Sequence, residues 1–316
     1  MISFRYHIVS IVSVFLALAV GVALGGGPLK GEVDNTLVEQ VRSDRQVKAD
    51  LRVQIAALRG GNQFTDDFAA TVAPTLLGGR LRGRVVTMVV LPTARQAEVA
   101  DLAQLVVLAG ARLGGTLRVG TDLLDSGQKQ FVEALGTRLQ SRAKGVVIPA
   151  DAGPYERIGA LVARAIGATA PGGAAVDPAA ESLLTGLGTA DLLSPEGRLS
   201  RRGDLVLFVA GPGRGGAVER TGTSSIITSL VQAVDAGTAG VVLAGPQASA
   251  REGGPVKAVR DDVSAGRVVS TVDSLGRTAG QVVTVMALAG QAAGRSGHYG
   301  SVDAADGAMP GARDGE

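Results

Sequence analysis

Residues 85–91 read Val-Val-Thr-Met-Val-Val-Leu, a continuous apolar stretch that lies between Arg84 and Pro92. An uninterrupted run rich in β-branched residues predicts a strand buried on both faces, as in parallel sheets with helices on either side. The runs at 205–210 and 241–244 have the same character. Together these runs indicate an α/β fold.

Helical patterns separate the predicted strands. We expect helices at 66–77, 93–109, 126–142, 154–168, 178–193, 224–234, 256–263 and 275–293, and further short strands at 116–119, 145–149 and 268–271. This alternation predicts a mainly parallel sheet with helices on both faces, in one extracytoplasmic domain at 62–293. The tail at 294–316 is rich in Gly, Ala and Asp, and we expect it to be disordered.

The chain before this domain contains an uncharged apolar segment at 8–24, IVSIVSVFLALAVGVAL. Extended through Gly27, and at about 1.5 Å per residue, a helix of this length crosses a hydrocarbon layer about 30 Å thick. We therefore predict a transmembrane anchor at 8–27, with residues 1–7 in the cytoplasm and the remainder outside. A cleaved signal peptide is an alternative, because Ala23-Leu24-Gly25 suits a signal peptidase, and a buried helix of a soluble protein is another.

Residues 30–60 predict a coiled-coil stalk. Its seam follows heptad spacing and consists of Leu37, Val41, Asp44, Lys48, Leu51, Ile55 and Leu58. So narrow an apolar stripe is typical of a coiled coil, and its polar centre can set register and partner number. The seam predicts self-association or pairing with another envelope protein; a lone amphipathic helix packed on the later domain is the alternative. Gly60 and Gly61 are expected to end the helix.

The composition excludes several kinds of protein. The 316 residues carry 31 basic and 29 acidic side chains, so no overall field favours nucleic acid. Cysteine is absent, which excludes disulfides and thiolate metal sites. Aromatic residues make up 3% of the chain, whereas a transmembrane β-barrel carries aromatic girdles. A pore formed by this domain alone is therefore disfavoured.

One glycine-rich segment resembles a phosphate-binding loop. Residues 211–216, Gly-Pro-Gly-Arg-Gly-Gly, follow the predicted strand at 205–210 and fit G-x-G-x-x-G. Such a loop binds pyrophosphate when a helix starts directly after it. Because the next helix is expected near Ser224 and Pro212 occupies the turn, we predict a flexible loop without a nucleotide.

The remaining polar clusters have ordinary explanations. Arg80, Arg82 and Arg84 form a basic turn that suits solvent, with an acidic polymer or lipid headgroups as the alternative. Three carboxylates near element ends are expected to be caps or turn formers: Asp122, Asp151 and Asp273. No nucleophile elbow or metal motif is present, and we predict that the protein is not an enzyme and has no cofactor.

Both ends of the chain resemble a known family. Residues 1–10, Met-Ile-Ser-Phe-Arg-Tyr-His-Ile-Val-Ser, the segments at 14–19 and 21–25, and the ending from 272–281 through 297–300 are similar to the actinobacterial copper transport outer-membrane protein family, also called mycobacterial copper transport protein B. The resemblance covers nearly the whole chain outside the tail. It implies a role in copper efflux and homeostasis, with an outer-membrane pore proposed. Relatives are tied to cell division and to control of peptidoglycan hydrolysis, as anchored partners of a second envelope protein.

This chain contains few of the side chains that copper ions prefer as ligands. Copper(I) prefers sulfur and copper(II) takes imidazole. The histidines are His7, at the predicted membrane edge, and His298, beside Tyr299, which is the one candidate ligand. From the residues we expect an anchored oligomeric or scaffold protein of the cell envelope, placed in the inner membrane although the family name implies the outer one.

Overall fold

The computed structural model describes residues 4–25, 29–141, 143, 145, 146 and 148–311, with the side chains of 29–37 outside the description. The chain divides into two compact units, Met1–Phe64 and Thr65–Glu316. Residues 26 and 27 of the predicted anchor, and 312–316 of the predicted tail, lie outside the described residues.

The first unit is helical. Helix α1 (Phe4–Gly25) has no buried residue and is the one helix among the described residues that is long and apolar enough to span a membrane. Helix α2 (Leu29–Leu77) is continuous, so the prediction that Gly60 and Gly61 end the stalk helix is wrong. An interior glycine costs about 1 kcal/mol relative to alanine, which helix-forming residues on both sides outweigh. The left-handed glycine after this helix is Gly79, with φ of 76°.

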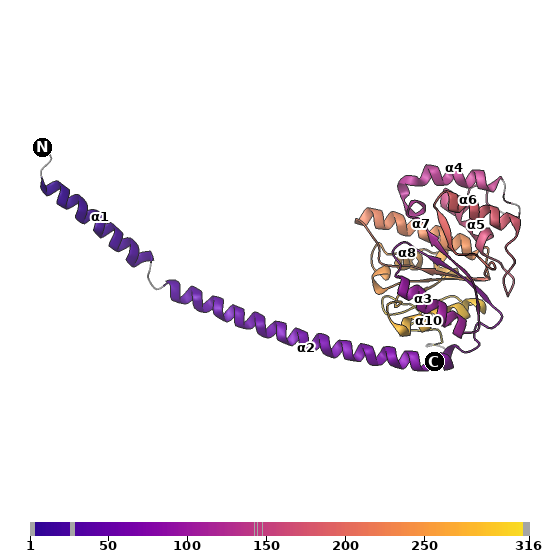
Figure 1. Ribbon diagram of the computed structural model, residues 1–316, viewed down its shortest axis with the longest axis horizontal. Helices are drawn as coiled ribbons and strands as arrows, with labels where there is room; N and C mark the ends of the chain where they lie inside the picture. The colour runs from indigo at the N-terminus through magenta and orange to yellow at the C-terminus, as the bar shows by residue number, and fades with distance from the viewer. Residues whose placement is uncertain (1–3, 26–28, 142, 144, 147, 312–316) are drawn as a thin grey trace. The chain divides into compact units, whose positions relative to one another are not determined.

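The second unit is built around a seven-stranded sheet (Figure 1). Its strands are β1 (Val85–Val90), β2 (Arg112–Val119), β3 (Leu193–Glu196), β4 (Leu205–Val209), β5 (Val241–Ala244), β6 (Ser270–Val272) and β7 (His298–Tyr299). They lie in the order β3-β2-β1-β4-β5-β6-β7, and every neighbouring pair is parallel except β2 with β3. The predicted α/β fold with a mainly parallel sheet is confirmed.

Helices cover both faces of the sheet, as Figure 1 shows. One face packs against α3 (Gln96–Leu108), α10 (Thr278–Ala292) and the last turns of α2. The other packs against α4 (Lys129–Gln140), α5 (Pro154–Ile166), α6 (Pro178–Thr189), α7 (Ala217–Asp235), α8 (Pro255–Asp261) and α9 (Ala265–Val268). Strand side chains alternate between the two cores, so that Met88 enters one and Val89 the other. Both faces are therefore apolar, which explains the unbroken hydrophobic runs.

Two strands occur where we expected none. The expected helix at 178–193 instead ends at Thr189, and Leu193–Glu196 pairs antiparallel with β2 at the sheet edge. Residues 298–299 pair with β6, so disorder from residue 294 is wrong for this part of the tail. Both strands are short, and they are ordered by pairing with strands that are distant in the sequence. Among the described residues of 145–149 there is no strand.

Candidate functional site

The centre of the sheet contains a topological switch point between β1 and β4. From β1 the chain builds outward through β2, and from β4 it builds outward through β5 in the opposite direction. Loops at the carboxyl ends of two such strands diverge and leave a crevice, where α/β proteins bind ligands. A cleft of about 310 Å³ lies here, between the segments that follow β1, β2 and β4 and the first turns of α7. This cleft is the candidate functional site.

The glycine-rich loop at 211–216 joins β4 directly to α7. Helix α7 begins at Ala217, with Gly216 as its N-cap, so the prediction of a helix start near Ser224 is wrong. Most residues of the first two turns are exposed, and apolar residues do not recur there at helical spacing. The sequence therefore shows no helical pattern in this part of α7. A helix N-terminus therefore follows the loop directly, which is the geometry that an anion-binding loop requires.

Glycine is required at the start of this loop. A Cβ atom at position 211 would lie 1.8 Å from the backbone oxygen of Thr93, in the segment after β1. Gly215 adopts φ of 79°, a left-handed conformation that suits glycine. The segments that follow β1 and β4 are thus in close contact where they line the cleft.

Some polar side chains of the cleft already form contacts within the protein, whereas others do not. The Nη1 atom of Arg220 donates to the backbone oxygen of Gly215 at 3.0 Å, and the carboxylate of Glu219 lies over the same glycine. Arg214 and Asp122 are exposed and take part in none of the hydrogen bonds or ion pairs between described residues. The cleft is lined by five charged side chains: Asp122, Asp125, Arg214, Glu219 and Arg220. Arg220 and Asp125 bond to the backbone, Asp125 by accepting from the N–H of Gly127 at 2.8 Å, which leaves Arg214 as the unengaged cation and Asp122 as the carboxylate on the opposite side.

The structure brings some of the predicted residues together and separates others. Asp122, on the 3₁₀ helix η1 (Thr121–Leu124), lines the cleft together with the 211–216 loop. Asp151 lies in an exposed turn, and Asp273 is fully buried beneath the C-terminal segment. The cleft also contains Arg214, which sequence reasoning did not select; its position within a glycine loop after a strand was the available signal.

The basic turn is not one cationic patch. Arg84 is partly buried and its Nε lies 2.5 Å from Oδ2 of Asp204, which is fully buried. Arg80 donates to the backbone oxygen of Leu76. Arg82 is exposed. At least one of the three arginines therefore serves the fold.

His298 lies half-buried in β7. Its Nδ1 is 3.0 Å from Oγ1 of Thr271, and its backbone N–H donates to Asp306 at 2.8 Å. Burial, and secondly the charge of Arg260, lower the pKa of His298, so the ring is neutral near pH 7 as copper(II) requires. Among the described residues no group of three or more His, Cys, Asp or Glu could hold a metal ion. His298 as a copper ligand stays a prediction.

The stalk seam lies on α2. Leu37 falls outside the described side chains, and the other seam residues are all exposed: Val41, Asp44, Lys48, Leu51, Ile55 and Leu58. The helix itself agrees with the sequence, while the pairing that would make it a coiled coil stays a prediction.

Comparisons with known proteins identify the family. A family model described as copper transport outer membrane protein, MctB, matches residues 1–310. Proteins named copper transporter MctB from Mycobacterium tuberculosis and Mycobacterium bovis are 28% identical over 95% of this chain and 96% of their own length. The copper transporter MctB of Mycobacterium leprae is 32% identical over 48% of this chain and 46% of its own. The family is named for transport and not for catalysis. The chain belongs to the MctB family, with a copper-related role in the cell envelope.

Proposed function

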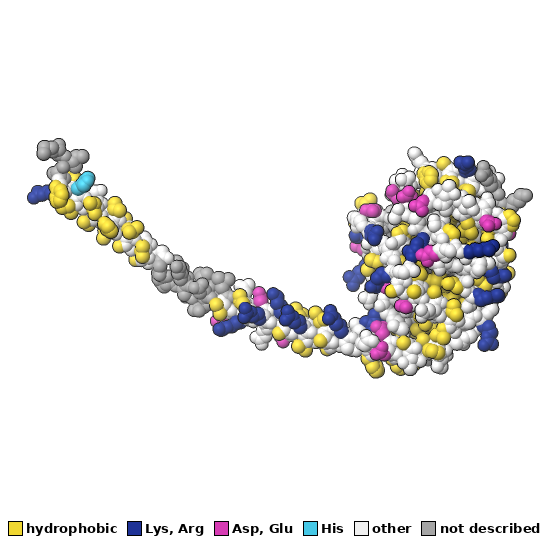
Figure 2. Space-filling model, in the orientation of Figure 1, with side chains coloured by type: hydrophobic (Ala, Val, Ile, Leu, Met, Phe, Trp, Pro, Cys, Tyr) yellow, Lys and Arg dark blue, Asp and Glu magenta, His cyan; other side chains and the backbone are white. Residues whose placement is uncertain are grey.

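We propose that this chain is a non-enzymatic, single-pass protein of the inner membrane that holds a complex together through a coiled-coil stalk. Its role in copper efflux would follow from that scaffold, with copper as cargo of the assembly. The composition of α1 supports the anchor, because apolar side chains occupy all its sides and none is buried. Figure 2 shows these hydrophobic side chains along the visible face of α1.

The stalk supports pairing through its exposed apolar seam. Val41, Leu51 and Ile55 expose 46%, 49% and 46% of their surface. Burying the exposed half of each side chain against a second helix contributes on the order of 1 kcal/mol. Asp44 and Lys48 interrupt the seam one turn apart, and such a polar layer restricts register.

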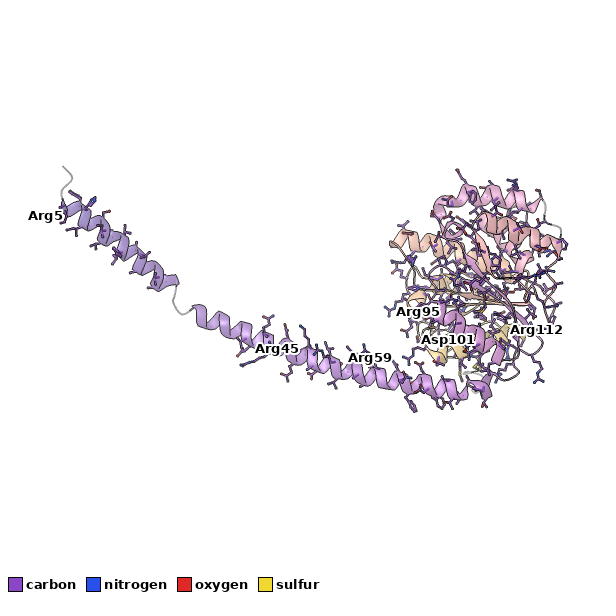
Figure 3. The ribbon with its side chains drawn as sticks, viewed as in Figure 1. Arg5, Arg45, Arg59, Arg95, Asp101 and Arg112 are labelled. Atoms are coloured by element: carbon purple, nitrogen blue, oxygen red, sulfur yellow. The ribbon has the colours of Figure 1, made fainter. Side chains whose placement is uncertain are left out.

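Charge beside the seam favours an acidic partner. Three arginines flank one side at heptad spacing: Arg45, Arg52 and Arg59. Arg45 and Arg59 are labelled on α2 in Figure 3. In a parallel pair of identical chains this row would face neutral residues: Gln40, Val47 and Gln54. Because flanking ion pairs decide partner choice in coiled coils, an acidic helix of another envelope protein fits the row better than a second copy does.

The proposal is tested on the full-length chain by cross-linking in native membranes and co-purification in detergent. We expect Leu51→Asp to abolish the association, since a carboxylate enters the seam. Val53→Asp is the matched control, because Val53 lies on the helix face opposite the seam and is 68% exposed. An association that survives Leu51→Asp would contradict the stalk model.

The nature of the partner is tested by charge reversal. We expect Arg52→Glu to weaken association with an acidic partner, whereas Arg42→Glu, which lies off the flanking row, leaves it unchanged. If Leu51→Asp separates the complex and Arg52→Glu has no effect, an acidic partner is excluded.

A second candidate function uses the same stalk. The family resemblance also implies a partner protein in cell division and regulation of peptidoglycan hydrolysis, and an exposed pairing seam serves that role equally. Cells carrying Leu51→Asp are expected to lose copper tolerance if scaffolding supports efflux. Unchanged tolerance combined with a failure of daughter cells to separate would favour the second function.

A further inference from the structure

We propose that the cleft at the switch point binds a small organic phosphate that carries neighbouring hydroxyl groups, such as a nucleotide or a sugar phosphate. This inference goes beyond the scaffold role and does not rest on it. It rests on the cavity, on its place in the sheet and on the side chains that line it.

The β4 side of the cleft suits the phosphoryl group. The first backbone N–H groups of α7 have no acceptor within the helix, and their dipoles favour an anion. Arg214, in the loop just before them, adds an unengaged guanidinium. A Cβ atom at Gly213 would lie 2.8 Å from Cδ of Arg220, so the absence of a side chain there keeps the backbone close to the cleft.

The opposite side suits hydroxyl groups. Asp122 follows β2, and β1 lies between β2 and β4, so Asp122 and Arg214 stand on segments about two strand spacings, or about 10 Å, apart. A carboxylate accepts hydrogen bonds from neighbouring hydroxyls, as it does from ribose in dinucleotide-binding folds. A ligand with a phosphoryl group at one end and a diol at the other satisfies both groups together.

The floor of the cleft is apolar. Leu91, Leu124 and Ile227 line it, and each is nearly fully buried. An apolar floor with a few convergent polar groups is typical of small-molecule sites, and a volume of about 310 Å³ matches the smaller of them. The floor would contact the face of a sugar ring or a base, which inorganic phosphate does not have.

Glu219 competes for the phosphoryl position. Its carboxylate lies over Gly215, next to the start of α7, and repels a second anion there. Binding must displace this side chain, so we expect Glu219→Gln to tighten binding several-fold. A site without phosphate recognition would not respond in this direction.

The test is isothermal titration of the full-length chain in detergent with AMP, glucose-6-phosphate, adenosine and inorganic phosphate. We expect at least one of the two phosphate esters to bind about tenfold or more tightly than adenosine or phosphate alone. Arg214→Ala should weaken that ester about tenfold or more, as loss of a charge-assisted contact does. Arg198→Ala is the matched control, because Arg198 is exposed, lies outside the cleft and engages none of the described residues.

The outcomes separate the possible ligands. Binding of AMP alone identifies a nucleotide, binding of glucose-6-phosphate alone identifies a sugar phosphate, and binding of both supports the shared chemistry. The proposal is overturned if neither ester binds or if inorganic phosphate binds as tightly as the esters. It is equally overturned if Arg214→Ala and Asp122→Asn both leave ester affinity unchanged.

Discussion

Asp273 and Arg260 form a buried ion pair, with 3.0 Å between Oδ2 of the carboxylate and Nη1 of the guanidinium. Asp273 follows β6, and it also accepts hydrogen bonds from the backbone N–H groups of Ser301 and Val302. Arg260 in turn donates to the backbone oxygen of Tyr299 at 2.9 Å. The pair therefore fastens β7 and the following segment to the sheet, although this part of the chain has few apolar residues.

Asp273→Ala should release the C-terminal segment and destabilise the domain. Removing one partner of a buried ion pair leaves an uncompensated charge and costs about 3–5 kcal/mol. Denaturant unfolding of the full-length chain measures this change. Asp261→Ala removes a solvent-exposed pair with Lys257 and should cost far less. Equal effects of the two substitutions would contradict a structural role for Asp273.

The same carboxylate predicts a loss of stability in acid. Burial raises the pKa of Asp273, but the N–H groups of Ser301 and Val302, with Ser274 and Arg260, outweigh burial and hold that pKa below its ordinary value. Its stabilising contribution is therefore present above the ordinary carboxyl pKa, about 4, and is lost as pH falls through the lower folded value. We expect Asp273→Asn to reduce the acid-dependent part of the unfolding free energy, measured from neutral pH downward.

Asp235 predicts the opposite dependence on pH. Burial at the end of α7 raises the pKa of Asp235 to about 6, despite a hydrogen bond from the backbone of Val241. Between about pH 4 and pH 6 the unfolded chain loses this proton first, so the contribution of Asp235 to stability falls as pH rises. Asp235→Asn should therefore stabilise the protein near pH 7 and have little effect near pH 4. Urea unfolding at the two pH values measures the change in unfolding free energy. An equal gain in stability at both pH values would contradict the prediction.

The close contact between the segments that follow β1 and β4 predicts a strong effect at Gly211. Gly211→Ala places a methyl group 1.8 Å from the backbone oxygen of Thr93 in the unrelaxed structure, and we expect a loss of about 2–4 kcal/mol. Gly216→Ala is the control, because a Cβ atom there meets nothing within 4 Å. Thermal unfolding compares the two variants; a tolerated Gly211→Ala would mean that the two segments are not in close contact as described.

The interior strands could be predicted because their signal is local. The run at 241–244 coincides with β5, and the run at 85–91 contains all of β1, since strands covered by helices on both faces need apolar side chains at every position. The start of α7 could not be found in this way. Residues 217–222 are mostly exposed, so burial imposes no apolar period on them.

The sequence by itself determined the apolar segment of α1, the helical stalk and the alternation of strands with helices. Each of these depends on the composition of a short stretch and on the burial it implies. The tertiary structure alone decided that β1 and β4 are neighbours, that Asp122 and the 211–216 loop share a cleft, and that Asp273 holds β7. These relationships join residues far apart in the chain, and strand order, which no local pattern encodes, brings them together.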